Sequence, residues 1–242
     1  MLRRNREINI FSMSALDLFA SALGAFILLT LILLPYYLKT GNDQTRQFKA
    51  QQQKIQQLEK QLKDSTSFAL LGISTKARSF TILIDMSGSM QQYTDIMLQT
   101  IHRILTPMKK HHKIQLIGYQ GEGQPLLHAW KKPHRLTPMT APNKQAALSW
   151  VDQLNQHFSG RTPTHAALLE ALKYKSEAII LLTDGAPNRP PDQIIEDITR
   201  RNQAGKQIHT IALGNYRANP ALVDFLQQLA KANHGGFLGV SN

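Results

Sequence analysis

The 242-residue sequence contains no cysteine, few aromatic residues and little acidic charge. The lack of cysteine excludes a disulfide scaffold, an iron–sulfur centre, a cysteine-ligated zinc site and a thiol nucleophile. Charged residues make up only 18% of the chain and alternate with apolar runs, which excludes a wholly disordered protein. The length suits one domain of ordinary size together with additional segments.

Acidic residues number 16 against 28 lysines and arginines, which gives a formal net charge of +12. The excess is spread over the whole chain and indicates a diffuse basic surface. Such a surface attracts nucleic acid, anionic lipid or an acidic protein without choosing among them. The densest basic run, residues 109–113 (KKHHK), has no interleaved aromatics. We interpret it as a solvated helix end and loop, and we expect no specific nucleic-acid partner.

The motifs of several enzyme classes are also missing. The chain has no Walker loop and no G-x-G-x-x-G segment, and its nine histidines lack the spacing of a zinc motif. Ser87 and Ser89 lie in D-M-S-G-S, where a nucleophile elbow needs G-x-S-x-G. Asp85 lacks the second carboxylate two positions later that phosphoryl-transferring aspartates generally use. We therefore expect a protein that is not an enzyme.

One long apolar run is present near the N-terminus. Its densest part, Ala15–Leu34, has about 20 residues, enough to cross the hydrocarbon core as a helix. A secretory signal peptide is the alternative, but it would have a shorter apolar region followed by a cleavage site of small residues. The run continues instead into Pro35 and two tyrosines that suit the membrane interface. We interpret residues 14–38 as an uncleaved transmembrane helix.

Three arginines, Arg3, Arg4 and Arg6, crowd the segment that precedes the helix, residues 1–13. The positive-inside rule then favours a cytoplasmic N-terminus and an extracytoplasmic C-terminal domain.

The polar, glutamine-rich segment 39–67 follows the helix. Phe48, Ile55 and Leu62 recur every seven residues, with Gln51 and Leu58 at the positions between them. The pattern fits either a solvated helical spacer or a short parallel coiled coil that pairs two copies of the chain. The second alternative predicts a homodimer.

The remaining segment, 68–242, alternates strand-like and helix-like stretches. This alternation predicts an α/β fold, a doubly wound and mostly parallel sheet with helices on both faces. Ligand sites in such folds lie at the carboxyl ends of the strands. The predicted strands are Ser79–Asp85, Lys113–Tyr119, Leu126–Lys131, Ala178–Thr183, Gln207–Leu213 and Gly236–Val240. The predicted helices are Gln92–Met108, Asn143–His157, Thr164–Lys175, Pro191–Ala204 and Pro220–Ala232.

Two carboxylates and three hydroxyls fall at the ends or beginnings of these elements. They are Asp85, Ser87, Ser89, Thr162 and Asp184. Oxygen donors of this kind suit Mg²⁺, Mn²⁺ or Ca²⁺ and are poor ligands for zinc. With few charged ligands, such a metal would keep an open position that an acidic group of a partner could fill. The alternative is that the three hydroxyl residues only cap helices and form turns.

The same five positions resemble a von Willebrand factor A domain with a metal-ion-dependent adhesion site. The first three match the family's D-x-S-x-S motif, Thr162 matches its loop threonine, and Asp184 lies in the matching T-D-G. Arg161 stands where the family usually has a second glycine. The resemblance implies a Rossmann-like fold, a Mg²⁺-class ion at these residues and an acidic protein ligand.

A second, shorter resemblance concerns Asp17. Residues 7–10 (EINI), followed by Asp17 and a single apolar helix, resemble the start of TolR, ExbD and MotB-type subunits. That resemblance implies an Asp17 that carries a proton or sodium ion, in a dimer inside a ring of five TolQ/ExbB/MotA-like multi-span subunits of the bacterial inner membrane. The usual soluble domain of those families is replaced here. The alternative is that Asp17 closes a capping box with Ser14.

Two main functions follow. One is a subunit of an ion-driven motor or stator whose A-type domain binds a partner through a metal. The other is a membrane-anchored adhesion or scaffold protein without ion translocation. A third requires the opposite topology, with a cytoplasmic A-type domain that serves a metal-inserting or AAA+ partner.

Overall fold

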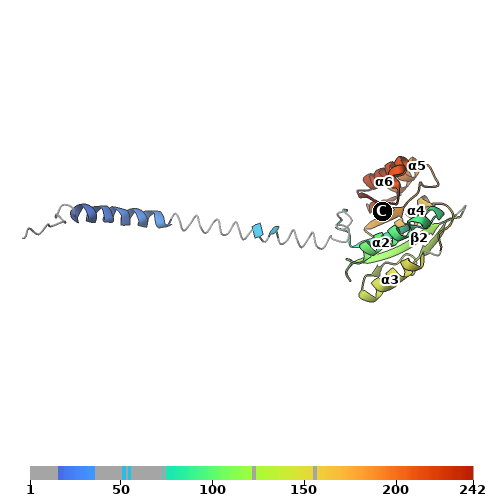
Figure 1. The fold of residues 1–242 in the computed structure, drawn as a ribbon, viewed down its shortest axis with the longest axis horizontal. Coiled ribbons are helices and arrows are strands. Elements are labelled where there is room, and N and C mark those ends of the chain that lie inside the picture. The colour runs from blue at the N-terminus through green and yellow to red at the C-terminus, as the bar shows by residue number, and fades with distance from the viewer. Residues whose placement is uncertain are drawn as a thin grey trace, which may run out of the picture. The chain divides into compact units, whose positions relative to one another are not determined.

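The computed structural model describes residues 16–35, 51–52, 54–55, 73, 75–121, 124–154 and 157–241. The chain divides into two units, Met1–Lys60 and Gln61–Asn242. In the first unit, Leu16–Pro35 form a helix of 20 residues with a mean hydropathy of 2.4 (Figure 1). Every side chain of this helix is exposed within the chain. By length and composition, the helix fits a membrane anchor or a signal sequence.

The predicted coiled coil falls largely outside the described residues. Of its seam, Gln51 and Ile55 are helical, and the side chain of Ile55 is exposed. Phe48, Leu58 and Leu62 lie outside the described residues, as do the three N-terminal arginines and the EINI stretch.

The second unit alternates strands and helices as the sequence predicts. In chain order its elements are β1 (Ser79–Asp85), the 3-10 helix η2 (Gly88–Tyr93), α2 (Thr94–Leu105), β2 (Lys113–Gln120), β3 (Leu126–Ala129), β4 (Thr137–Pro138), α3 (Ala141–Gln153), α4 (Thr164–Leu172), β5 (Ala178–Thr183), α5 (Pro191–Arg201), β6 (Gln207–Leu213), η4 (Tyr216–Ala218), α6 (Pro220–Ala232) and β7 (Phe237–Val240).

The strands form one sheet in the order β3-β2-β1-β5-β6-β7, with β4 also paired to β2. Strands β2, β1, β5, β6 and β7 run parallel to their neighbours, whereas β3 and β4 pair antiparallel with β2. The predicted α/β fold with a mostly parallel sheet is confirmed. Strand β3 and the helices α2, α3, α4 and α5 end two to four residues before their predicted bounds. Two further details differ from the prediction. β4 has only two residues, too few to leave a sequence pattern, and the helix expected from Gln92 begins as the 3-10 helix η2 directly behind the β1 loop.

Alternate residues of the central strands enter two separate cores, because successive side chains point to opposite faces of a sheet. Ile82 and Ile84 of β1 pack in one core with residues of α2 and α3, and Leu83 packs in the other with residues of α4, α5 and α6. Figure 1 shows α3 and α6 on opposite sides of the sheet. Because both faces are covered, β1 and β5 are buried along their whole length, which explains their continuous apolar runs.

The strand order also fixes where a ligand can bind. The chain moves outward from β1 through β2 to β3, and later returns to β5 on the other side of β1. Such a reversal of strand order opens a crevice at the carboxyl ends of the two strands that flank it. Asp85 is the last residue of β1, and Asp184 directly follows β5.

Candidate metal site

Three loops meet at this end of the sheet and carry the five predicted residues. Asp85, Ser87 and Ser89 come from the loop after β1, Thr162 from the segment before α4, and Asp184 from the loop after β5. Asp85, Ser87 and Thr162 are buried, whereas Asp184 is half-buried and Ser89 is exposed. The site therefore has a buried carboxylate at its floor and a second carboxylate at its rim.

Two hydrogen bonds hold the carboxylate of Asp85. Its Oδ1 accepts from the backbone N–H of Ser87 at 2.8 Å, and its Oδ2 accepts from the hydroxyl of Thr183 at 2.5 Å. The same hydroxyl oxygen accepts from the backbone N–H of Gly185 at 3.2 Å. Thr183 thus positions both the β1 carboxylate and the β5 loop. Thr183 was not among the predicted site residues, although a hydroxyl residue that closes an otherwise apolar strand could have indicated a role.

The hydroxyls of the β1 loop link this floor to the rim. The Oγ atoms of Ser87 and Ser89 lie 3.2 Å apart, and the hydroxyl of Ser89 donates to Oδ1 of Asp184 at 3.0 Å. Four of the five predicted residues are therefore joined by consecutive short contacts from Asp85 to Asp184.

Backbone contacts bring the Thr162 loop to the same place. Gly160 adopts a positive φ of 69°, which favours glycine, and its carbonyl accepts from the N–H of Gly88 at 3.1 Å. A Cβ placed on Gly185 would lie 3.5 Å from the hydroxyl oxygen of Thr162 and 3.7 Å from that of Ser89. The hydroxyl oxygens of Thr162 and Ser89 thus both lie next to Gly185. The structure therefore brings Thr162 together with the other four residues.

Arg161, which replaces the family's second glycine, is exposed. Its backbone N–H and C=O both bond to Gly121 at 3.2 Å, so the peptide groups on each side of Arg161 are held while its side chain stands free of the sheet. The guanidinium makes no ion pair with any residue in the described ranges.

The electrostatics of the site favour a cation. Burial raises the pKa of Asp85 to about 7, against the opposing hydrogen bonds from Thr183 and Ser87. Burial also raises the pKa of Asp184, and its hydrogen bond from Ser89 acts in the opposite direction. Neither carboxylate pairs with a basic side chain in the part of the chain that the structure describes. A buried carboxylate without a counter-charge is costly, and a bound cation removes that cost.

The donor set fits a hard divalent ion. No group of three or more histidine, aspartate or glutamate side chains that could hold a metal occurs among the described residues. Hydroxyl oxygens must therefore share the coordination with the two carboxylates, a set that suits Mg²⁺, Mn²⁺ or Ca²⁺ and not zinc. Asp17 lies on the helix of the first unit, where its side chain is exposed.

Comparisons with known proteins agree with the fold. The family model described as "von Willebrand factor type A domain" matches residues 79–237. The human "von Willebrand factor A domain-containing protein 3B" is 30% identical over 159 residues, which cover 64% of this chain but only 11% of that protein.

Several solved structures align with part of this chain at low identity. The SpRpn10 VWA domain aligns with a TM-score of 0.47 and 14% identity, over 68% of this chain and 88% of that one. The human COPII-coat protein Sec24c aligns with a TM-score of 0.46 and 13% identity, over 68% of this chain and 30% of that one. The PilB minor pilin of Streptococcus sanguinis aligns with a TM-score of 0.43 and 12% identity, over 68% and 56%.

Replacing Asp85 by Asn should stabilise the protein at pH 8 in the presence of a chelator. The folded-state pKa of about 7 lies above the ordinary 3.8, so ionisation of Asp85 opposes folding. This destabilisation grows as the pH rises from about 4 to 7 and is fully present above 7. An amide can still accept from Ser87 and donate to the Thr183 oxygen. We expect the free energy of unfolding of Asp85→Asn to exceed that of the wild type by roughly 2–4 kcal/mol at pH 8 and by little at pH 4.

Both tryptophans, Trp130 and Trp150, lie in the second unit, so their fluorescence during urea unfolding reports on this domain. Asp224→Asn is the matched control, because this exposed carboxylate on α6 accepts a hydrogen bond from Gln228 of the same helix and lies away from the candidate site. A stability difference between Asp85→Asn and wild type that does not change from pH 4 to pH 8 would contradict the assignment.

Proposed function

The chain belongs to the von Willebrand factor type A domain family, and from this premise we propose that its A-type domain binds an acidic protein partner through one divalent cation. The ligands of the cation are Asp85, Ser87, Ser89, Thr162 and Asp184. The observation that carries the proposal is the convergence of these five side chains from three loops, with consecutive contacts of 2.8–3.2 Å along the β1 loop to Asp184.

Each ligand has a distinct part in this proposal. Asp85 supplies the buried negative charge that draws the cation inward, and Thr183 and the Ser87 amide keep that carboxylate oriented. The hydroxyls of Ser87, Ser89 and Thr162 add neutral oxygen donors. Asp184 supplies the second charge at the exposed rim.

When bound, Mg²⁺, or Mn²⁺ or Ca²⁺ in its place, would supply a positive charge with an open position toward solvent. Only two of the five protein ligands are charged, so a carboxylate of the partner remains attractive to the ion. Arg161 stands exposed in the same loop as Thr162, and its guanidinium would add a second attraction for an acidic partner.

The helix Leu16–Pro35 is proposed as a membrane anchor. Its 20 residues and mean hydropathy of 2.4 support this role. The arginine-rich N-terminus supports a cytoplasmic start and an extracytoplasmic A-type domain in a bacterial inner membrane, and the heptad pattern of the linker supports a homodimer. The protein would then be an anchored adhesion or scaffold module.

A second candidate function is that of a subunit of an ion-driven motor, with Asp17 as the carrier of protons or sodium ions. The supporting observation is that Asp17 is the one charged residue of the described helix Leu16–Pro35. A carboxylate in a membrane helix is costly and most often functional. The partner would be a ring of multi-span TolQ/ExbB/MotA-like subunits. The comparisons match the A-type domain alone, so this candidate rests on the residues around Asp17.

The metal proposal predicts that Asp184→Asn weakens Mn²⁺ binding at least about tenfold, because it removes one of two charged ligands. The amide oxygen can still accept from Ser89, which preserves the loop. Binding is measured by calorimetry on the full chain in detergent, with Asp224→Asn as the control that removes a carboxylate elsewhere. Equal Mn²⁺ affinity in the Asp184 variant and the control would exclude this site as the metal site.

The motor candidate predicts that Asp17→Asn abolishes activity while membrane insertion and dimerisation persist. Asparagine has nearly the same size and capping ability as aspartate, but its amide cannot take up or release a proton. The measurement is proton or sodium flux in vesicles that contain this protein and its multi-span partner, with Ser21→Ala in the same helix as control. Full flux with Asp17→Asn would retire the motor candidate and leave the anchored adhesion module.

A further inference from the structure

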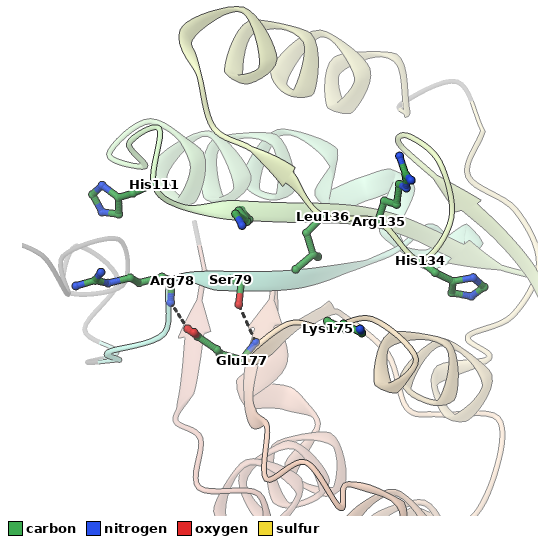
Figure 2. A pocket seen from close by; sticks show the side chains of 9 residues that line it. Arg78, Ser79, His111, His134, Arg135, Leu136, Lys175 and Glu177 are labelled. Atoms are coloured by element: carbon green, nitrogen blue, oxygen red, sulfur yellow. Dashed lines mark hydrogen bonds between the residues drawn. The ribbon is translucent and has the colours of Figure 1, made fainter.

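A hollow opens at the end of the sheet opposite the candidate metal site, where the parallel strands begin. It has a volume of about 590 Å³ and lies where β1 and β2 begin and just before β5. Its lining residues, which we call the basic pocket, are Arg78, Ser79, His111, Lys113, His134, Arg135, Leu136, Lys175 and Glu177. Figure 2 shows that these side chains come from separate segments around the hollow.

The backbone of the basic pocket is fixed without using its cationic side chains. The carboxylate of Glu177 accepts from the backbone N–H of Arg78, and the N–H of Glu177 donates to the hydroxyl of Ser79 at 3.0 Å (Figure 2). The carbonyl of Arg78 accepts from the N–H of Lys113 at 2.9 Å. Glu177 is the one acidic residue of the lining, and its carboxylate is engaged by a peptide group.

Four cations line the basic pocket against the single carboxylate of Glu177. Arg78, Lys113, Arg135 and Lys175 are exposed, and none forms an ion pair with another residue of the described ranges. Of the two histidines in the lining, His134 contacts Glu170 at 2.9 Å. Charges of one sign gathered around a concave surface create a positive potential that attracts anions.

The pKa of His112, which precedes Lys113, is lowered mainly by burial. The nearby groups His111, Lys109 and Arg78 lower it further, against a backbone hydrogen bond at Lys109 that raises it. From its sequence, the run 109–113 is expected to be a solvated helix end and loop. In the structure, its residues His111 and Lys113 line the same pocket as Arg78, Arg135 and Lys175.

We infer that the basic pocket binds a compact anion that carries two or more phosphate groups, either free or as the headgroup of a lipid. Four permanent cations on separate segments can neutralise more than one phosphate, and arginine forms paired hydrogen bonds with phosphate oxygens. The volume suits a small ligand. No phenylalanine, tyrosine or tryptophan is among the described lining residues, so the stacking platforms that single-stranded nucleic acids use are missing.

The test uses the full chain in phosphatidylcholine nanodiscs, with pyrophosphate as the probe and EDTA present. Without divalent cations the candidate metal site cannot contribute, so the result is independent of the proposed function. The variant is the double substitution Arg135→Gln and Lys175→Gln, because both side chains are exposed and unpaired within the described ranges and their loss should spare the fold. The control, Arg103→Gln with Lys231→Gln, removes two exposed charges outside the pocket.

Calorimetry should show pyrophosphate binding to the wild type, a loss of about tenfold or more in the variant, and little change in the control. If the phosphate groups that the pocket binds belong to a lipid headgroup, we expect free pyrophosphate to bind weakly. Hydrogen exchange around residues 111–113 and 134–136 is then slower in cardiolipin-containing nanodiscs than in phosphatidylcholine ones, and only the pocket variant loses this protection.

Three results would overturn the inference. The first is the absence of both pyrophosphate binding and cardiolipin-dependent protection, and the second is an equal effect of the pocket and control variants. The third is a single-stranded oligonucleotide that binds more tightly than pyrophosphate and depends on Arg135 and Lys175, which would make this end of the sheet a nucleic-acid surface.

Discussion

The buried carboxylate of Asp85 is the constraint on which the candidate site depends. It sits at the end of the central strand, fully enclosed, and no basic side chain of the described residues neutralises it. A hydroxyl from β5 and a backbone amide from its own loop hold it in place. The fold therefore retains a carboxyl group whose ionised form opposes folding, at a position where three loops converge. Ionisable groups in such unfavourable surroundings are typical of functional sites.

The sheet topology explains why that carboxyl lies where several loops meet. The reversal of strand order next to β1 directs the β1 and β5 loops to opposite faces, and the loop with Thr162 closes the gap between them. The same topology gathers the beginnings of β1 and β2 at the other end of the sheet, where lysines and arginines meet around a hollow. The domain thus has an acidic, oxygen-rich site where the parallel strands end and a basic pocket where they begin, and its two apolar cores lie on the two faces of the sheet.

Much of this could be predicted from the sequence, for physical reasons. The buried strands SFTILID and AIILLT are largely apolar; the first ends in Asp85 and the second is followed directly by Asp184, so both the strands and their functional ends were identifiable. The family motif then indicated Thr162. The supporting role of Thr183 and the backbone bridge between Gly121 and Arg161 depend on tertiary contacts that no local pattern encodes. The basic pocket was missed because its cations are scattered along the sequence from Arg78 to Lys175 and meet only when the strands align.

The most direct measurement of the central claim is anomalous X-ray diffraction from crystals of the A-type domain grown with Mn²⁺. The account predicts one strong anomalous peak bounded by Asp85, Ser87, Ser89, Thr162 and Asp184, with hydroxyl oxygens at about 2.0–2.4 Å from the ion. A saturated crystal with no peak at this position, or with its peak elsewhere on the domain, would contradict the account.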